Sequence, residues 1–237
     1  MKIRVATHFA ALAALTALLL VAAACSSSGG GSDRSAARNH FLNGGFENGK
    51  DPWFALKPPE FQLSQDVVHS GENSVLLEMR DGPEESGNQI YYLVQEFTAD
   101  ALPETLSGYY RVENWNKGTR KQYLQFVVIV FDPANMTGSP NFQIRYLVAG
   151  IDSPPFPIGN AKFIFLSRED PVTDEWVYFE RNVREDFQEV WGTVPEGFDN
   201  VRVLFEVRWD DKVSGDGAPQ GDIYYDDLYW GPPDGAG

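Results

Sequence analysis

Apolar and polar residues alternate along much of the chain from about residue 70 to residue 230. In the segment 201–209, five apolar residues alternate with the residues Arg202, Leu204, Glu206 and Arg208. A period of two places successive side chains on opposite faces of a β-strand, so this pattern predicts a strand with one face in a core. Comparable segments, which we also expect to form strands, are 73–80, 88–99, 105–115, 121–133, 141–151, 161–170, 175–186, 200–211 and 221–230.

Turn-forming residues separate these segments, as in "DGPEESG", "DPANMTGSP", "DSPPFPIGN" and "VPEGFDN". About nine short strands with Pro- and Gly-rich turns predict an all-β sandwich. We expect one domain over residues 40–232, followed by a short tail at 233–237. A domain of this length can bury a core without disulfides.

The polar face of segment 201–209 allows two interpretations. Arg202, Glu206 and Arg208 can form an ordinary solvent surface, or they can form the floor of a concave sheet. Solvent surface is the simpler interpretation, because antiparallel sheets commonly bury one face and expose the other to water. We therefore predict that this face is solvated.

The N-terminal segment has the pattern of an export signal. Lys2 and Arg4 precede an apolar run that ends at Cys25, and this run is shorter than a membrane span. The letters "AAAC" resemble the lipobox of bacterial lipoproteins, in which the cysteine becomes the first mature residue and carries the lipid. We expect a signal peptide at 1–24, lipidation of Cys25 and a flexible Gly/Ser linker at 25–39, with an ordinary secretory signal as the alternative.

A lipidated cysteine would place the protein in the cell envelope. If the organism has two membranes, the outer membrane or the cell surface is the expected location, because Ser26 and not Asp follows the cysteine. The chain carries a net charge of -15. This charge argues against a nucleic-acid partner, whose phosphates require a basic surface, and it suits the binding of cations.

Three segments of the expected domain carry recognisable motifs. The domain opens with "NGGFENGKDPW", continues with "HSGENSVLLE" and ends with "EWVYFERNVRED", "VPEGFDNVRVLFEVRWDD" and "GDIYYDDLYW". In this order the segments resemble the carbohydrate-binding modules of families four, nine and twenty-two, which share a galactose-binding-like jelly-roll fold. The resemblance covers both ends of the domain, whereas the middle, at about 113–170, is longer than in the family. It implies an all-β jelly-roll sandwich that binds polysaccharide.

The resemblance also implies a structural calcium ion. Residues carried over from the family motifs are Glu47 of the opening stretch and Asp226 of the terminal pair, with Asn43, Asn73 and Asp227 as further candidates. Calcium takes carboxylate and carbonyl oxygens, and ligands from both chain ends would join the first strand to the last. Phe46 and Trp53 are expected beneath this turn. The alternative is a plain turn in which Glu47 is a surface acid.

Catalysis is not expected. The motifs Gly-x-Ser-x-Gly, His-Glu-x-x-His and the phosphate-binding loop are absent from the chain. Adjacent acids such as Glu169 and Asp170 point to opposite faces of a strand, so they are no sign of the facing carboxylates of a glycosidase.

Sugar binding requires aromatic rings that stack on pyranose faces and polar groups that bond to hydroxyls. The candidate platforms are Trp191 and Trp115, which we expect in loops, together with Tyr123 and Trp176, and Trp53 and Tyr110 are weaker candidates. Because Trp176 matches a structural tryptophan of the family, we expect it to pack in the core rather than to bind sugar. Polar candidates on strands are Gln125, Glu206, Arg208, Gln143 and Arg145.

Two classes of function follow from the sequence. The first is non-catalytic polysaccharide binding by a lipid-anchored envelope protein. The second is a structural or protein-interaction module of the same fold without sugar specificity. The long middle segment with its "DSPPFPIGN" loop favours the second somewhat, because such an insertion can cover a binding face.

Overall fold

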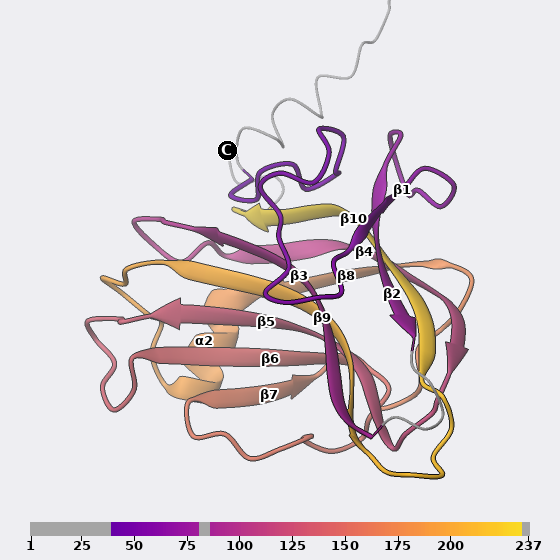
Figure 1. Cartoon of the computed structure of the whole chain (residues 1–237). Helices are drawn as coiled ribbons and strands as arrows, with labels where there is room; N and C mark the ends of the chain where they lie inside the picture. The colour runs from indigo at the N-terminus through magenta and orange to yellow at the C-terminus, as the bar shows by residue number, and fades with distance from the viewer. Residues whose placement is uncertain (1–38, 81–85, 234–237) are drawn as a thin grey trace, which may run out of the picture.

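The computed structural model describes residues 39–80 and 86–233, which form a sandwich of two five-stranded sheets (Figure 1). The first sheet has the strand order β1 (Gln62–Ser64), β2 (Ser74–Arg80), β10 (Gln220–Gly231), β4 (Thr105–Asn116) and β8 (Trp176–Asn182). The second has the order β3 (Gly87–Phe97), β9 (Val201–Lys212), β5 (Lys121–Phe131), β6 (Asn141–Ala149) and β7 (Ala161–Phe165). The predicted all-β sandwich is confirmed.

Neighbouring strands are antiparallel except for β6 and β7, which run parallel. The predicted parity of segment 201–209 is also confirmed. Val203, Phe205 and Val207 face the core between the sheets and are fully buried. At about 25 cal/mol per Å² of apolar surface removed from water, this shared core supplies the main force that holds the two layers together.

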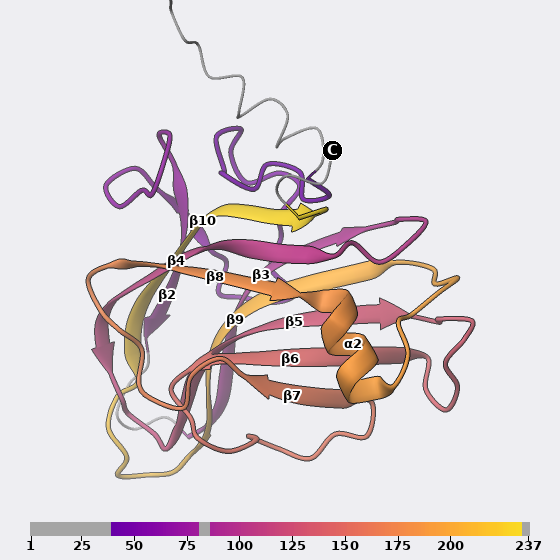
Figure 2. The same cartoon turned by 180° about the vertical axis from the view of Figure 1, so that it is seen from behind.

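One prediction about secondary structure is wrong, because the segment expected to continue the strand at 175–186 turns into a helix. The helix α2 spans Val183–Trp191 and covers the inner side of the β5–β7 part of the second sheet (Figure 2). Asn182 caps its first turn by accepting a hydrogen bond from the Glu185 backbone N–H, and Gly192 ends it in the left-handed region. Phe187 then packs in the core.

The beginning of the described chain joins its last strand. The His40 backbone N–H donates to the carbonyl of Trp230 at 2.8 Å, and the Leu228 N–H donates to the carbonyl of Gly44 at 2.9 Å. A Cβ atom at Gly44 would lie 2.0 Å from the Leu228 carbonyl oxygen, so only glycine permits this approach. Backbone hydrogen bonds therefore connect the two ends of the domain.

No helix in the described part of the chain has the length and apolar character needed to cross a membrane. Cys25 and the expected signal peptide and linker lie outside the described residues.

Candidate functional site

The carboxylate of Glu47 holds the loop that precedes β2. Its Oε1 accepts hydrogen bonds from the backbone N–H groups of Glu72 and Asn73, at 3.0 and 3.1 Å. Gly71 makes this approach possible, since a Cβ atom there would lie 2.2 Å from the same oxygen. As expected, Phe46 is buried beneath this turn.

Asp226 of β10 holds the other end of the same loop. Its Oδ2 accepts from the backbone N–H groups of His69 and Ser70, at 2.9 and 3.2 Å. The neighbouring Asp227 contacts the His69 ring Nδ1 at 2.7 Å and accepts from the Ser70 hydroxyl at 2.8 Å. Burial raises the pKa of Asp226 to about 6, although the backbone donors act in the opposite direction.

The recorded partners of these carboxylates are hydrogen-bond donors. Calcium needs about six to eight oxygen ligands, whereas Glu47 and Asp226 face N–H donors. The Asn43 side chain is used within the opening turn, where it donates to the carbonyls of Gly49 and Asp51. Among residues 39–80 and 86–233, no group of three or more His, Cys, Asp or Glu side chains is placed to hold a metal. Calcium remains a prediction, and the contacts assign Glu47 and Asp226 a role in fixing the 69–73 loop.

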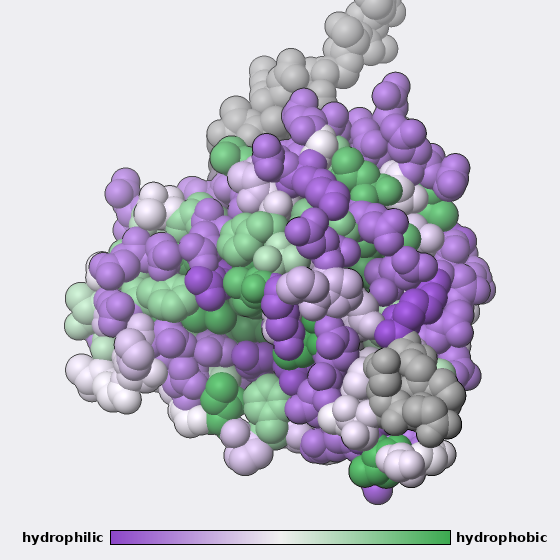
Figure 3. Space-filling model, in the orientation of Figure 1, coloured by the Kyte–Doolittle hydropathy of each residue, from purple (hydrophilic) through white to green (hydrophobic). Residues whose placement is uncertain are grey.

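The outer face of the second sheet, seen from the front in Figure 3, is not the solvated surface that we predicted. Leu204, Glu206 and Arg208 are 4%, 3% and 8% exposed, so the polar side of β9 is almost fully buried. We call its polar part the charged face, and it comprises Tyr123, Gln125, Arg145, Glu206, Arg208 and Asp210. Next to it, apolar side chains such as Val94 and Val127 form a separate cluster.

Ion pairs along β9, together with contacts from Tyr123 of β5 and Arg145 of β6, hold the charged face together. Arg208 donates to Asp210 from Nε at 3.1 Å and from Nη2 at 2.6 Å, and the Tyr123 hydroxyl donates to the same carboxylate at 2.8 Å. Glu206 lies 3.8 Å from Arg208 and 3.9 Å from Arg145. Removing such charges from water is costly unless they are paired, so the partners make this burial possible.

The neighbouring acids offset the burial of Arg208 more fully than that of Arg145. Burial would lower the pKa of Arg208, but Tyr123 and the adjacent acids outweigh it and raise that pKa. For Arg145 burial dominates and lowers the pKa. Arg145 Nη1 and Gln125 Oε1 are both buried without a hydrogen-bond partner within the described chain. Two buried polar atoms on one face therefore lack the hydrogen bonds that such groups ordinarily make.

The loop between β6 and β7 covers part of the charged face. The ring of Phe156 lies 5.4 Å from the guanidinium carbon of Arg145 and 5.2 Å from that of Arg208. It also meets Phe163 of β7 edge-on at 5.8 Å. This loop belongs to the long middle segment, and its position agrees with the expectation that the segment can cover a binding face.

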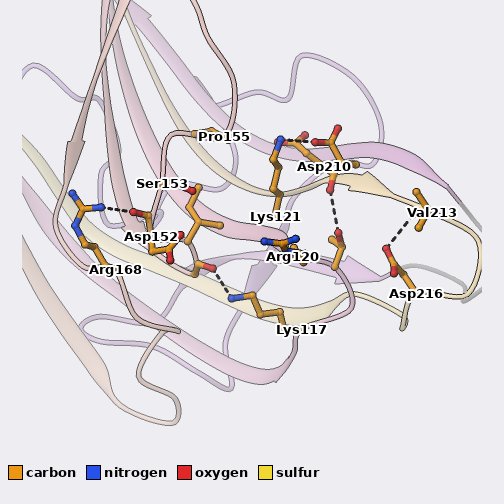
Figure 4. A pocket seen from close by; sticks show the side chains of 14 residues that line it. Lys117, Arg120, Lys121, Asp152, Ser153, Pro155, Arg168, Asp210, Val213 and Asp216 are labelled. Atoms are coloured by element: carbon orange, nitrogen blue, oxygen red, sulfur yellow. Dashed lines mark hydrogen bonds and ion pairs between the residues drawn. The ribbon is translucent and has the colours of Figure 1, made fainter.

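A polar pocket of about 670 Å³ opens beside the charged face, with Asp210 common to both. It lies between the turns after β4, β6 and β9 (Figure 4). Four basic and four acidic residues line it, namely Lys117, Arg120, Lys121, Arg168, Asp152, Asp210, Asp211 and Asp216.

Four of these eight charged side chains form ion pairs, Arg168 and Asp216 bond only to backbone groups, and the remaining two have no partner among the described residues. Lys117 pairs with Asp170 at 2.9 Å, and Lys121 pairs with Asp211. The side chains of Arg120 and Asp152 are exposed and form no hydrogen bond or ion pair with other described residues. Figure 4 shows Arg120 near the middle of the ring of lining side chains. The pocket thus offers one free donor group and one free acceptor group.

The expected aromatic platforms lie elsewhere. Trp191 is not in a loop: it is the last residue of α2, its Nε1 donates to the Gln143 carbonyl at 3.2 Å, and Lys162 lies over its ring. Trp115 is in β4 and packs against the core, so the expected loop position is wrong here as well. Tyr123 and Gln125 expose no surface. A binding role for these residues remains a prediction.

The structure brings together Tyr123, Gln125, Glu206 and Arg208, but it separates them from Trp191 and Trp115. Sequence reasoning missed the pocket residues Arg120 and Asp152. Their only signal was their position in polar turns, which many surface residues share.

No protein-family profile and no curated protein matches the sequence. Solved structures with a similar fold include a carbohydrate-binding module of family 61 in complex with β-1,4-galactotriose, at 16% identity and TM-score 0.44 over 81% of this chain and 97% of that one. The xylan-binding domain of family 22 matches at 12% identity and TM-score 0.44, over 82% of this chain and 95% of that one. Endo-β-1,4-glucuronan lyase from the fungus Trichoderma reesei matches at 14% identity and TM-score 0.46, over 82% of this chain and 95% of that one.

At these identities and TM-scores, the matches carry no information on ligand or activity.

Proposed function

We propose that this protein binds carbohydrate without catalysing a reaction, and that lipid on Cys25 anchors it to the cell envelope. The observation that carries the proposal is the polar pocket beside the charged face. Its volume of about 670 Å³ suits a few sugar units, and its lining consists mainly of charged and hydroxyl side chains. Such side chains can bond to the many hydroxyls of a glycan.

Within the pocket, Arg120 and Asp152 are the residues proposed to contact the ligand. Both side chains are exposed and free of partners among the described residues, so a ligand need not break an existing ion pair. The guanidinium of Arg120 donates to sugar oxygens, and the carboxylate of Asp152 accepts from sugar hydroxyls. Lys117 and Lys121 remain in their ion pairs and shape the walls.

The test is affinity electrophoresis of the full-length protein, purified in mild detergent, through gels that contain single soluble polysaccharides. We expect retardation by at least one glycan and a clear loss of it in Arg120→Ala and Asp152→Ala. The matched control is Arg184→Ala, because Arg184 is an exposed arginine on α2, also without a partner among the described residues. Unchanged mobility in every polysaccharide would contradict carbohydrate binding.

The lipid anchor has a separate test. Cells that express the chain with Cys25→Ser should release it from the membrane fraction, and they should not incorporate labelled fatty acid into it. Membrane retention and labelling of this variant would contradict the proposal.

One observation favours a second candidate, an envelope protein-interaction module without sugar specificity. Phe156 covers Arg145 and Arg208, so the charged face is closed to a large ligand in this conformation. Absence of glycan binding, together with an intact fold, would support this candidate.

A further inference from the structure

Aromatic side chains gather on the outer face of the first sheet, on the opposite side of the sandwich from the charged face. Tyr109 of β4 pairs with Tyr178 of β8, and Arg111 pairs with Trp176, so these side chains point to the same face. Val177 and Phe179, which alternate with them, contact the core instead. The expectation that Trp176 packs in the core is therefore wrong. We call His69, Tyr109, Trp176 and Tyr178 the aromatic strip.

The rings of the strip touch one another and remain accessible. His69 stacks on Tyr109 with 3.6 Å between ring centroids, and Tyr109 meets Tyr178 at 5.1 Å. Trp176 lies edge-on to His69 at 5.6 Å. Tyr178 is 50% exposed, and Trp176 and Tyr109 are half-buried. Large aromatic side chains bury much apolar area in a core, so a cluster left at the surface indicates a binding site.

The 69–73 loop fixes one end of the strip. Asp227 contacts the His69 ring at 2.7 Å, and Asp226 and Glu47 accept the backbone N–H groups on either side of the turn. These contacts hold His69 against Tyr109 before any ligand arrives. A preorganised surface loses less conformational entropy on binding than a mobile one.

The rim of the strip is polar and mostly acidic. The Tyr178 hydroxyl donates to Glu180 at 2.5 Å, and Asp227 lies at the His69 end. Arg111, the basic residue beside Trp176, is already paired with Glu113 at 2.7 Å. A pyranose is bound by rings that stack on its apolar C–H faces and by carboxylates that accept hydrogen bonds from its hydroxyls. The strip and its rim offer both groups. The acids would repel an anionic sugar.

We propose that the aromatic strip is a glycan-binding surface of its own, selective for a neutral polysaccharide and separate from the pocket. A protein partner fits the strip less well, because stable protein interfaces bury about 1,200–2,000 Å² around a dry centre. Charged side chains border the rings on this face. A linear neutral glycan needs only consecutive rings and a polar edge.

The test is affinity electrophoresis of the full-length protein in mild detergent, with galactan or hydroxyethyl cellulose as neutral probes and polygalacturonate as the anionic probe. We expect Tyr178→Ala and Trp176→Ala each to weaken binding of a neutral probe by about tenfold. Tyr178→Phe keeps the ring and should bind as the unmodified chain does. Phe54→Ala removes a 38% exposed ring remote from the strip and should also have no effect.

Tryptophan fluorescence gives a second readout. A neutral probe should shift the emission of the unmodified chain, and Trp176→Phe should lose this shift while it retains most of its binding. If the rings had only a structural role, Trp176→Phe would not lose the fluorescence shift while it retained binding.

The outcomes distinguish the strip from the pocket. If Arg120→Ala abolishes retardation and the strip variants behave like the unmodified chain, the strip proposal is overturned and the pocket assignment stands. If only the strip variants lose binding, the strip is supported and the pocket assignment fails. Retardation by polygalacturonate alone would overturn the claimed preference for neutral glycans, and no retardation at all would overturn both proposals.

Discussion

The outer faces of the two sheets use their polar and aromatic residues in different ways. On the second sheet, Glu206 and Arg208 are buried and pair with each other, and the ring of Phe156 lies over Arg208. On the first sheet, Trp176 and Tyr178 are accessible, and only the rim carries charge. The covered face contributes to stability through paired charges, whereas the open face is available to a ligand. Substitutions should therefore separate stability from binding.

The largest effect on stability is expected for Arg208→Ala. It would leave the carboxylate of Asp210 buried with only the Tyr123 hydroxyl as a direct partner. Breaking a buried ion pair from one side costs about 3–5 kcal/mol of unfolding free energy. Urea unfolding followed by fluorescence measures this loss. The control Arg184→Ala on the exposed side of α2 should stay within about 0.5 kcal/mol of the unmodified chain, and equal effects of the two variants would contradict a closed charged face.

Glu47→Ala should destabilise the fold by about 1.5 kcal/mol, because two backbone N–H groups lose a charged acceptor. The measurement is thermal unfolding with excess chelator, so that no metal contributes. The same experiment tests calcium. A melting temperature of the unmodified chain that falls on chelation, with no such fall in Glu47→Ala, would establish a metal at this turn. A melting temperature that Glu47→Ala leaves unchanged would contradict the role of the carboxylate in holding the loop.

Phe156→Ala should cost about 1 kcal/mol, the typical contribution of a partly buried cation–π contact. Since Phe156 acts on Arg208, the effect should be smaller when Arg208 is already replaced. A double-mutant cycle measures this coupling, and strictly additive free energies would show that the loop does not cover the charged face in solution. Val172→Ala, at a 52% exposed apolar residue, is the matched control.

Tyr178→Ala should have the smallest effect on stability, within about 0.5 kcal/mol, because half of the side chain is already in water. The same variant should lose neutral-glycan binding. A large loss of unfolding free energy would show instead that the aromatic strip is part of the structural framework.

Much of the architecture could be predicted from local sequence patterns. Alternation identified the core side of β9, and the turn residues separated the strands correctly. The helix α2 was missed although its signals are present: Asn182 before it, acids in its first turn and Gly192 after it. Apolar residues such as Val183 and Phe187 also suit the end of a strand, and the pattern of β8 immediately before them favoured that interpretation.

The candidate sites were less predictable. Trp176 matches a residue expected to be structural, yet its parity on β8 places it outside the core. Glu47, Asp226 and Asp227 do meet around one loop, as the resemblance implied. Their carboxylates accept hydrogen bonds there from backbone N–H groups and from a hydroxyl group. Such partners cannot be read from the spacing of the acids, because the 69–73 loop and β10 are far apart in the chain.

By itself, the sequence determined the two-layer β-sandwich, the core face of β9 and the crowded turn around Glu47. These features depend on neighbouring residues, whose periodicity and turn propensity are local properties. Only the tertiary structure decided that Glu206 and Arg208 are covered and that Trp176 and Tyr178 are open. Periodicity tells which side chains share a face, but the cover of that face comes from segments distant in sequence, here the loop that carries Phe156.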